Sequence, residues 1–474
     1  MFENKTQIVV IGAGPGGYAA AFYAADHGFN VTLVDSEPNP GGVCVYKGCI
    51  PSKTLLHTAK ILNEAKEAKI FGVEFSEPKI DLDKIRSWKD NVVGKLTKNL
   101  GILSKMRKIT SIQGRATFEN SHSLKIQKTK GGEELLNFDH AIIATGSRPI
   151  TLPHLSIDSP RVMNSTQGLE LKDIPKTLLV IGGGYIGLEL GTVYAALGSQ
   201  VTVVEMTPSL LPGVDRDMTN ILTKRIRSHF HALLLETKVV SISEVPNGIK
   251  VIFEGASVQE KEQVFEKILV AVGRKPNSSG LGLENTKVQI DPKGFIKINP
   301  QRQTSEPNIY CIGDVAGEPM LAHKASHEAR VAVDAIAGRK VAFEPNAIPA
   351  VVFTDPEIAW CGLSETQAVK ENIPYKLAKF PWGASGRAST LDRNDGLTKL
   401  ILNPETERIL GVGIVGLGAG ELIAEGVLAV EMGAVAADIK FSIHPHPTLS
   451  ETFMESAEVF YGHSTHIYQP KKSP

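Results

Sequence analysis

The chain has 474 residues, of which 42% are hydrophobic and 22% charged, and its 51 basic side chains are balanced by 51 acidic ones. A formal net charge of zero argues against nucleic acid or an anionic membrane as a general partner, because both select basic proteins. The length predicts three or four globular domains with sizeable hydrophobic cores. The 4 cysteines are too few for the disulfide framework of a small secreted protein.

No targeting segment is visible at the N-terminus, although a precursor already trimmed to its mature form would look the same. An apolar strand, residues 7–11, runs directly into Gly12, so we expect neither a signal nor a transit peptide. The most apolar stretch, residues 411–437, contains three glutamates that a lone membrane-spanning helix would not bury. We therefore expect a core strand followed by a half-buried helix there, and no membrane association.

The same strand, glycine loop, helix and strand occur twice in the chain. The Gly-x-Gly-x-x-Gly loops contain Gly12, Gly14 and Gly17 in the first unit and Gly182, Gly184 and Gly187 in the second. In each loop the first glycine permits a tight turn, the second lets backbone approach a pyrophosphate, and the third lets the helix pack on the strand. Asp35 and Glu205 follow 18 positions after the last glycine, where a carboxylate can accept hydrogen bonds from an adenosine ribose. Two such units predict two bound dinucleotides.

Hydrophobic periodicity indicates the remaining elements. Helices are predicted over residues 50–69 and 81–106. Strands are predicted around residues 239–253 and at 141–146, 269–274 and 309–314. From about residue 347 the pattern becomes α+β, with strands at 375–380 and 398–401 and helices at 365–371 and 419–432. The sequence thus predicts an α/β fold with two Rossmann-like dinucleotide-binding domains plus a C-terminal α+β domain.

Cys44 and Cys49 form a close pair at the start of a predicted helix. If the backbone there is roughly helical, their spacing lets the two sulfurs meet in a disulfide, and a helix N-terminus lowers the pKa of a thiol. A disulfide that closes so short a loop contributes little stability. A metal site is not expected, because only His57 lies nearby and it cannot complete a tetrahedral ligand set. Buried free thiols are the alternative, but the spacing favours redox chemistry.

The segment 41–53, Gly-Gly-Val-Cys-Val-Tyr-Lys-Gly-Cys-Ile-Pro-Ser-Lys, resembles the redox signature of the pyridine nucleotide-disulfide oxidoreductases. The resemblance extends essentially end to end and includes both glycine units and the segments 144–146, 313–314 and 444–451. It implies tightly bound FAD at the first unit, NAD as co-substrate at the second, and a homodimer. It also implies an FAD-binding domain at 1–150, an NAD-binding domain at 151–275, a central domain completing the FAD site at 276–346, and an interface domain at 347–474.

The resemblance assigns roles to the matching residues. Cys44 would be the thiol that exchanges with substrate, and Cys49 the thiol next to the flavin. Lys53 would lie near the flavin and pair with Glu189, and Tyr185 would lie where the nicotinamide docks. The implied FAD contacts are Gly12, Gly14, Gly17, Asp35, Lys53, Gly114, Thr145, Gly146, Asp314 and Ala322. The implied NAD contacts are Gly182, Gly184, Tyr185, Gly187, Glu189, Glu205, Val239 and Gly273. The family usually has a glutamate where this sequence has Asp35.

His446 resembles the catalytic base of the family. A thiol substrate needs a base that titrates near neutral pH, and histidine is the side chain that does so. Glu451, five residues later, would orient the imidazole and stabilise its charged form. A solvated or packed histidine is the alternative for a single residue of this type. The resemblance implies that His446 and Glu451 act in the active site of the partner subunit, while His444 has a supporting position.

Glu205 separates this chain from several relatives. A carboxylate there accepts from the 2′-hydroxyl of NAD and repels the 2′-phosphate of NADP, which argues against glutathione reductase and other NADP enzymes. A mercuric reductase or a high-molecular-weight thioredoxin reductase would carry a further cysteine pair near its C-terminus, and residues 468–474 have none. A soluble transhydrogenase lacks the complete pair formed here by Cys44 and Cys49. A non-catalytic flavoprotein subunit is disfavoured because every expected catalytic residue is present.

The segment 380–388, Phe-Pro-Trp-Gly-Ala-Ser-Gly-Arg-Ala, resembles the bacterial branch of the family that oxidises protein-bound dihydrolipoamide with NAD. Because the chain shows no lipoyl domain of its own, the expected partners are the lipoyl domains of an acyltransferase or the H protein of the glycine cleavage system. The expected location is the bacterial cytoplasm.

Overall fold

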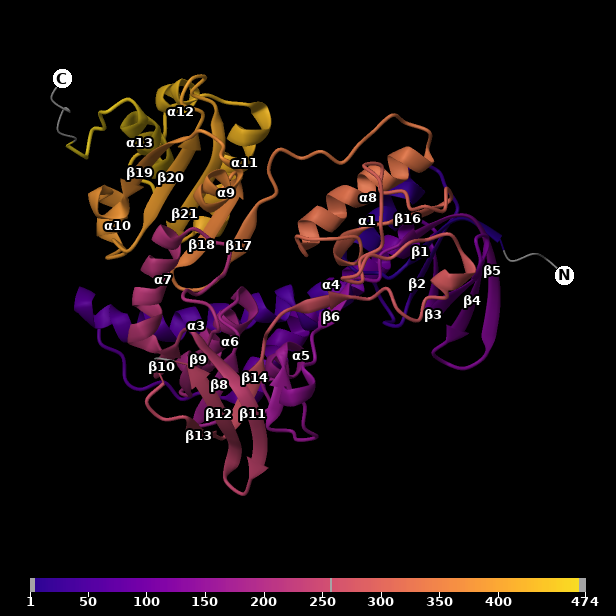
Figure 1. The fold of residues 1–474 in the computed structure, drawn as a ribbon, viewed down its shortest axis with the longest axis horizontal. Coiled ribbons are helices and arrows are strands. Elements are labelled where there is room, and N and C mark those ends of the chain that lie inside the picture. The colour runs from indigo at the N-terminus through magenta and orange to yellow at the C-terminus, as the bar shows by residue number, and fades with distance from the viewer. Residues whose placement is uncertain (1–4, 256–257, 469–474) are drawn as a thin grey trace.

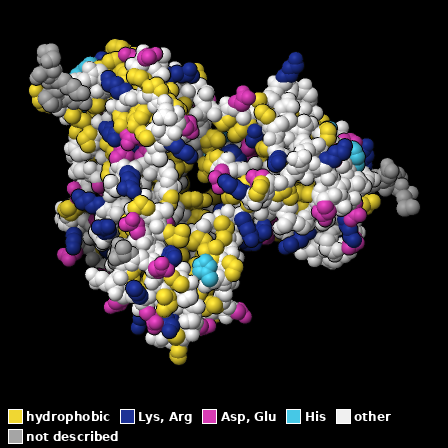
Figure 2. Space-filling model, in the orientation of Figure 1, with side chains coloured by type: hydrophobic (Ala, Val, Ile, Leu, Met, Phe, Trp, Pro, Cys, Tyr) yellow, Lys and Arg dark blue, Asp and Glu magenta, His cyan; other side chains and the backbone are white. Residues whose placement is uncertain are grey.

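The computed structural model describes residues 5–255 and 258–468, and these residues fold into three lobes (Figure 1). The first glycine unit lies in the lobe at the right of Figure 1, the second in the lower lobe, and the C-terminal domain in the upper left lobe. Basic and acidic side chains are interspersed over most of the face seen in Figure 2, in agreement with the zero net charge. Residues 469–474, which belong to the C-terminal segment without a second cysteine pair, lie outside the described residues.

The first lobe is a parallel sheet in the order β3-β2-β1-β5-β16, with an antiparallel extension. The central strand β1 pairs in parallel with β2 and β5, and its residues 8–11 are buried on both faces. β3 and β5 continue past this sheet and pair with β4 in an antiparallel meander. The strands are β1 Lys5–Ile11, β2 Val31–Asp35, β3 Thr110–Asn120, β4 Ser123–Lys128, β5 Glu133–Ile143 and β16 Ile309–Cys311.

The segment 276–346 adds to this first lobe. It supplies β16 at the sheet edge, a short 3₁₀ turn at Gly313–Val315, and helix α8 (Ala322–Ile336). Helix α8 packs against α1 (Pro15–Asp26), the helix that follows the first glycine loop. A segment remote in sequence therefore completes one wall around the first glycine loop.

The second lobe repeats this plan. Its parallel sheet has the order β10-β9-β8-β14-β7, and β11, β12 and β13 form an antiparallel meander beside it. The strands are β7 Val162–Asn164, β8 Thr177–Ile181, β9 Gln200–Val204, β10 Ala232–Leu234, β11 Thr237–Val245, β12 Gly248–Gly255, β13 Glu262–Phe265 and β14 Lys267–Val270. The helices are α5 Ser165–Glu170, α6 Tyr185–Ala196 and α7 Arg216–His229. The predicted pair of Rossmann-like units is confirmed.

One predicted strand proves to be two pieces. The sequence pattern continues from 269 to 274, but β14 ends at Val270, and β15 (Arg274–Pro276) instead pairs with β6 (Ser147–Pro149). Gly273 has a φ of +123°, a left-handed backbone that turns the chain out of the parallel sheet. The β6–β15 pairing joins the first and second lobes.

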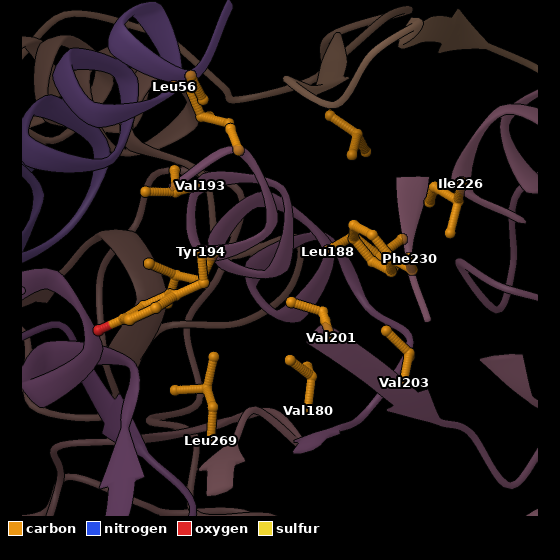
Figure 3. Close-up of a cluster of buried hydrophobic side chains, with 14 of the residues drawn as sticks. Leu56, Val180, Leu188, Val193, Tyr194, Val201, Val203, Ile226, Phe230 and Leu269 are labelled. Atoms are coloured by element: carbon orange, nitrogen blue, oxygen red, sulfur yellow. The ribbon is translucent and has the colours of Figure 1, made fainter. Parts of the chain in front are cut away.

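Two long helices connect the lobes. The first is α3 (Cys49–Glu67), which begins at the cysteine pair and continues into a 3₁₀ turn at Ala68–Phe71. The second is α4 (Leu82–Met106), and the short helix α2 (Gly42–Lys47) precedes α3. Leu56 of α3 belongs to the same buried cluster as Leu188 and Val193 of α6 (Figure 3). The hydroxyl of Tyr194 in this cluster donates to the carbonyl of Gly168 at 2.9 Å. The helix that carries the cysteines is thereby packed on the second dinucleotide unit.

The C-terminal lobe is an antiparallel sheet in the order β17-β18-β21-β20-β19. Its strands are β17 Ala350–Val352, β18 Glu357–Gly362, β19 Lys376–Pro381, β20 Leu397–Leu402 and β21 Ile409–Gly416. Its helices are α9 Glu365–Glu371, α10 Gly386–Thr390, α11 Ala419–Met432, α12 Ala436–Phe441 and α13 Glu451–Phe460. The apolar stretch 411–437 is a buried strand followed by α11, as predicted. Across the described residues, every helix is too short or too polar to cross a membrane.

A buried ion cluster joins the second lobe to the C-terminal lobe. The Lys399 ammonium on β20 lies 2.7 Å from Asp215 and 2.8 Å from Asp217 at the start of α7, and only 1% of its side chain is exposed. Asp215 also accepts hydrogen bonds from the backbone and hydroxyl of Thr366. Burial alone would raise the pKa of Asp215, but the bonds from Lys399 and Thr366 hold it below its ordinary value.

Replacing Lys399 with Met should destabilise the protein by about 3–5 kcal/mol, because it leaves buried carboxylates without their cation. Lys379→Met is the matched control: Lys379 pairs with the same Asp217, but 35% of its side chain is exposed, so its loss should cost no more than about 1 kcal/mol. Unfolding in urea, followed by circular dichroism, measures both.

The stability of this ion cluster should depend on pH. Because folding lowers the pKa of Asp215, its negative charge stabilises the fold at pH values above the ordinary pKa of a carboxyl group. This contribution is lost as the pH falls through the lowered pKa. The deficit of Lys399→Met should therefore shrink in acid, and an equal deficit at every pH would contradict this account.

Candidate active site

The first glycine loop is held open by backbone geometry. Gly12 has a φ of +98°, and a Cβ there would lie 2.4 Å from the carbonyl oxygen of Ala144. Gly17 packs just as closely, because its Cβ would lie 1.8 Å from the Gly12 oxygen. At the end of β2, the Asp35 carboxylate accepts from the backbone N–H of Ala13 at 2.6 Å. The loop is therefore fixed with its backbone accessible, as pyrophosphate binding requires.

The second loop has the same construction. Gly182 has a φ of +109°, and a Cβ on Gly187 would lie 2.4 Å from the Gly182 oxygen. The Glu205 carboxylate accepts from the backbone N–H of Gly183 at 2.7 Å and from Thr207 at 2.8 Å. Gly184 has open space around its Cβ position, so the backbone there can be approached by a ligand.

A cavity of about 380 Å³ lies between the first two lobes. Its lining extends from Asp35 and the first glycine loop to the cysteine pair and the start of α6. The predicted site residues that line it are Gly12, Gly14, Asp35, Cys44, Cys49, Lys53, Thr145, Gly146, Tyr185, Glu189, Asp314 and Ala322. An elongated cavity with a nucleotide-type loop at one end and a cysteine pair at the other fits FAD.

Some predicted contact residues lie elsewhere in the described chain. Gly17 packs beneath the glycine loop. Gly114 follows Gln113, the β3 residue that pairs in register with Asp35, and is not part of the cavity lining. Val239 is 8% exposed and belongs to a hydrophobic core cluster of the second lobe that also contains Ile181 and Val204. The sequence pattern could not separate these positions from lining residues, because they lie beside the site in the fold.

The cysteine pair opens into this cavity. Cys44 lies in α2 and Cys49 is the first residue of α3, and both are free thiols here. A hydrogen bond from Cys44, followed by the charge of Lys53, lowers the pKa of Cys49 to about 7. The same hydrogen bond and burial raise the pKa of Cys44. Of the two thiols, Cys49 is therefore the one that loses its proton first.

Lys53 and Glu189 form the predicted ion pair. The Lys53 ammonium lies 2.8 Å and 3.0 Å from the two carboxylate oxygens of Glu189, whose side chain is 4% exposed. Ser52 donates its hydroxyl to the same carboxylate at 2.8 Å, and Phe353 of the C-terminal lobe donates its backbone N–H at 3.1 Å. Neither Ser52 nor Phe353 was predicted as a site residue from the sequence. Ser52 stands inside the redox segment, but no local pattern marks Phe353.

The lining of the cavity also contains a polar cluster around Asp314. Its carboxylate accepts from the Ser147 hydroxyl at 2.5 Å, and Arg274 donates to the same Ser147 oxygen at 2.8 Å. Tyr185 lies in the lining beside Arg274, and burial raises the pKa of its phenol. Ser147 and Arg274 were not predicted from the sequence either. They come from β6 and β15, whose pairing only the fold reveals.

His446 and Glu451 form a dyad at the surface of the C-terminal lobe. The His446 Nδ1 lies 2.8 Å from a Glu451 oxygen, and the other oxygen accepts from the backbone N–H of Thr448 at 2.8 Å. Burial would raise the pKa of Glu451, but these two partners hold it below its ordinary value. The His446 side chain is 70% exposed. Within the described chain, this dyad does not line the cavity that contains the cysteines.

His444 is held by a separate contact. Its Nε2 lies 2.8 Å from a carboxylate oxygen of Glu425 on α11, and its Nδ1 lies 2.8 Å from the carbonyl oxygen of Ser442. The His444 side chain is 6% exposed, so it anchors the loop that carries the exposed His446.

Comparison with known proteins agrees with this geometry. Residues 6–329 match the family model described as pyridine nucleotide-disulphide oxidoreductase, and residues 348–457 match the dimerisation domain of that family. The dihydrolipoyl dehydrogenase of Haemophilus influenzae is 48% identical over 99% of this chain and 98% of its own, and that of Bacillus subtilis is 42% identical over 98% of both.

Solved structures show the same likeness. The crystal structure of LpdA from Mycobacterium tuberculosis has a TM-score of 0.89 and 27% identity, and it covers 95% of this chain and 99% of its own. The flavoprotein disulfide reductase RclA from Escherichia coli has a TM-score of 0.83 and 28% identity over 96% of this chain and 99% of its own. With the doubled nucleotide unit, the C-terminal domain and the cysteine pair in place, the chain belongs to the pyridine nucleotide-disulfide oxidoreductase family, whose members use FAD and a pyridine nucleotide.

Proposed function

We propose that this protein is a dihydrolipoyl dehydrogenase, which oxidises protein-bound dihydrolipoamide to lipoamide and reduces NAD to NADH. The observation that carries this proposal is the position of the cysteine pair: Cys44 and Cys49 both open into the cavity between the dinucleotide units, and the nearby charge of Lys53 helps to lower the pKa of Cys49. Such a pair can exchange with a dithiol substrate on one side and pass electrons to a cofactor on the other.

We assign FAD to the cavity and NAD to the second glycine loop, with domains at 1–150, 151–275, 276–346 and 347–474. When bound, FAD accepts an electron pair from the dithiol and supplies hydride chemistry to NAD. Asp35, Thr145 and Asp314 are the polar residues of the lining that would hold FAD. Gly182, Gly184 and Glu205 would hold the NAD pyrophosphate and ribose.

The chain's own residues perform the thiol chemistry. His446 of the partner subunit removes the proton from one thiol of dihydrolipoamide, and the new thiolate attacks the sulfur of Cys44 in the oxidised pair. The Cys44–Cys49 bond breaks, and Cys49 leaves as the thiolate that its lowered pKa favours. The second substrate thiol then displaces Cys44 from the mixed disulfide, so lipoamide is released and both cysteines are reduced. The charge of Lys53 stabilises the Cys49 thiolate throughout.

A homodimer follows from the separation of the dyad and the cysteines. His446 needs to reach a substrate thiol, yet it is exposed on a different lobe from the cavity lined by Cys44. The dimerisation domain of the family covers residues 348–457, which include His446 and Glu451. We infer that each active site combines the cysteines of one subunit with the dyad of the other.

The lipoyl group would come from another protein, either the lipoyl domain of an acyltransferase or the glycine cleavage H protein. Glu205 favours NAD, because its carboxylate would repel the 2′-phosphate of NADP. The bacterial relatives support a cytoplasmic location.

The proposal is tested by NADH formation, followed by its absorbance, with dihydrolipoamide as the thiol substrate. We expect turnover with dihydrolipoamide and NAD, and rates lower by at least about tenfold with NADP. The Glu205 carboxylate would repel the 2′-phosphate of NADP, and the charge-assisted hydrogen bond from the 2′-hydroxyl of NAD would be lost. Reduced glutathione is the parallel substrate control. Faster turnover with NADP or with glutathione would contradict the proposed function while leaving the family unchanged.

Replacing Cys44 with Ser should abolish dihydrolipoamide turnover and leave FAD bound, because the serine hydroxyl cannot form a mixed disulfide. The measurements are the NADH assay and the FAD content of the purified protein. Cys361→Ala is the matched control: its thiol is buried in the C-terminal lobe, so turnover should persist. Residual turnover in the Cys44 variant, or loss of its FAD, would refute the role given to Cys44.

Replacing His446 with Gln should lower kcat by about 10² or more, the usual effect of removing a general base. His463→Gln provides the control, because His463 is an exposed histidine of the same lobe outside the dyad. Steady-state kinetics at several pH values measure both variants. A His446 variant with nearly normal kcat would remove this residue from the mechanism.

A further inference from the structure

Phe353 contacts both members of the Lys53–Glu189 ion pair. Its backbone N–H donates to a Glu189 oxygen at 3.1 Å, and the Lys53 ammonium lies 4.4 Å from the centroid of its ring. Phe353 directly follows β17 in the C-terminal lobe, and its half-buried ring packs against the core cluster that includes Leu56 of α3. The ring is therefore held in place by the core and not by the lysine.

Lys53 lies between two cavities. One is the cavity that contains the cysteines, and the other, of about 300 Å³, is bordered by Phe353. Four carboxylates contribute to the lining of this second cavity. Glu64, Glu67 and Asp355 have basic partners in Lys60, Arg225 and Arg393, whereas Glu357 accepts a hydrogen bond from the backbone N–H of Gly420. A lysine stem has several freely rotating bonds, so the Glu357 carboxylate is the one of these four that can compete with Glu189 for the Lys53 ammonium group.

We propose that Phe353 is a positioning residue that keeps the Lys53 ammonium on Glu189, beside the cysteine pair, and out of the second cavity. The negative face of the ring attracts the ammonium directly, and a rigid aromatic group at the border of the second cavity resists rotation of the lysine into it. The backbone N–H of Phe353 fixes the Glu189 carboxylate at the same time. This inference rests on the proposed function, in which Lys53 acts through Cys49.

The consequence is electrostatic. The Lys53 charge is one of the causes of the lowered pKa of Cys49. If the ammonium moves away from the cysteine pair, the Cys49 thiolate loses stabilisation and its pKa rises. A change at Phe353 should therefore alter the titration of a thiol that Phe353 does not touch.

The experiment uses FAD-loaded dimer carrying Cys44→Ser, so that Cys49 is the reactive thiol of the pair. Cys311 and Cys361 are 0% and 1% exposed and react slowly. Iodoacetamide attacks the thiolate form, so the alkylation rate of Cys49 across pH, followed by mass spectrometry of its peptide, reports its pKa. Phe353→Leu removes the ring and keeps apolar volume, whereas Phe353→Tyr keeps the ring face.

With Phe353→Leu we expect the alkylation midpoint to rise by roughly half a pH unit, which is about a threefold lower rate on the acid side. Phe353→Tyr should retain the midpoint of the parent protein. With Cys44 intact, kcat for dihydrolipoamide should fall by about threefold or more in the Leu variant and recover in the Tyr variant.

Phe22→Leu is the matched control. Phe22 lies in α1, where Arg107 stacks on its ring at 4.9 Å, and it does not contribute to either cavity in the described chain. Its loss removes a comparable cation–ring contact, and the Cys49 midpoint should not change. FAD content and thermal midpoint establish that each variant is folded. If the Leu variant does not fold, Phe353→Met replaces it, because the flexible methionine fills irregular space.

An unchanged Cys49 midpoint in the folded Leu or Met variant would overturn the proposal. Equal shifts in the Leu and Tyr variants would overturn it as well, because the ring face would then be irrelevant. A protein that does not oxidise dihydrolipoamide at all would refute the proposed function. The alkylation midpoints do not depend on that substrate, and they would still decide the role of Phe353.

Discussion

The arrangement of the lobes depends on the hydrogen bonds and the ion pair made by the buried carboxylate of Glu189. An ionised carboxylate with a 4% exposed side chain is tolerated only where hydrogen bonds and a cation replace its lost water. Here the partners come from different parts of the chain: Ser52 and Lys53 from α3, and Phe353 from the C-terminal lobe. The carboxylate itself is on α6 of the second lobe. The connecting helix α3, the second lobe and the C-terminal lobe must therefore all be correctly placed before this charge is satisfied.

The two dinucleotide units fix the shape of their glycine loops in the same way. Asp35 and Glu205 each accept a hydrogen bond from a backbone N–H of the glycine loop. The acid at the end of the second strand thus holds its own loop in shape, in addition to any contact with a ribose. Preorganisation of this kind lowers the entropy lost when a nucleotide binds.

The cysteine pair and the His446–Glu451 dyad lie on surfaces that do not meet within one described chain. The cysteines open into a cavity formed by the first two lobes, while His446 is exposed on the third. The loop that carries it is nevertheless well anchored, through His444 and Glu425. An exposed but rigid base is suited to completing a site on another subunit, because little entropy is lost when it docks.

The sequence by itself determined the glycine units, the cysteine pair, the Lys53–Glu189 pairing implied by the family resemblance, and the His446–Glu451 dyad, because each depends on short spacing or on a motif. The tertiary structure alone decided the contacts of Phe353, Ser147 and Arg274. These residues approach the site from strand ends and from a separate lobe, and no local periodicity records which distant strands will pair. The burial of Val239 in the core of the second lobe, and the place of Gly114 outside the cavity lining, were decided in the same way, because burial depends on the packing of the whole chain.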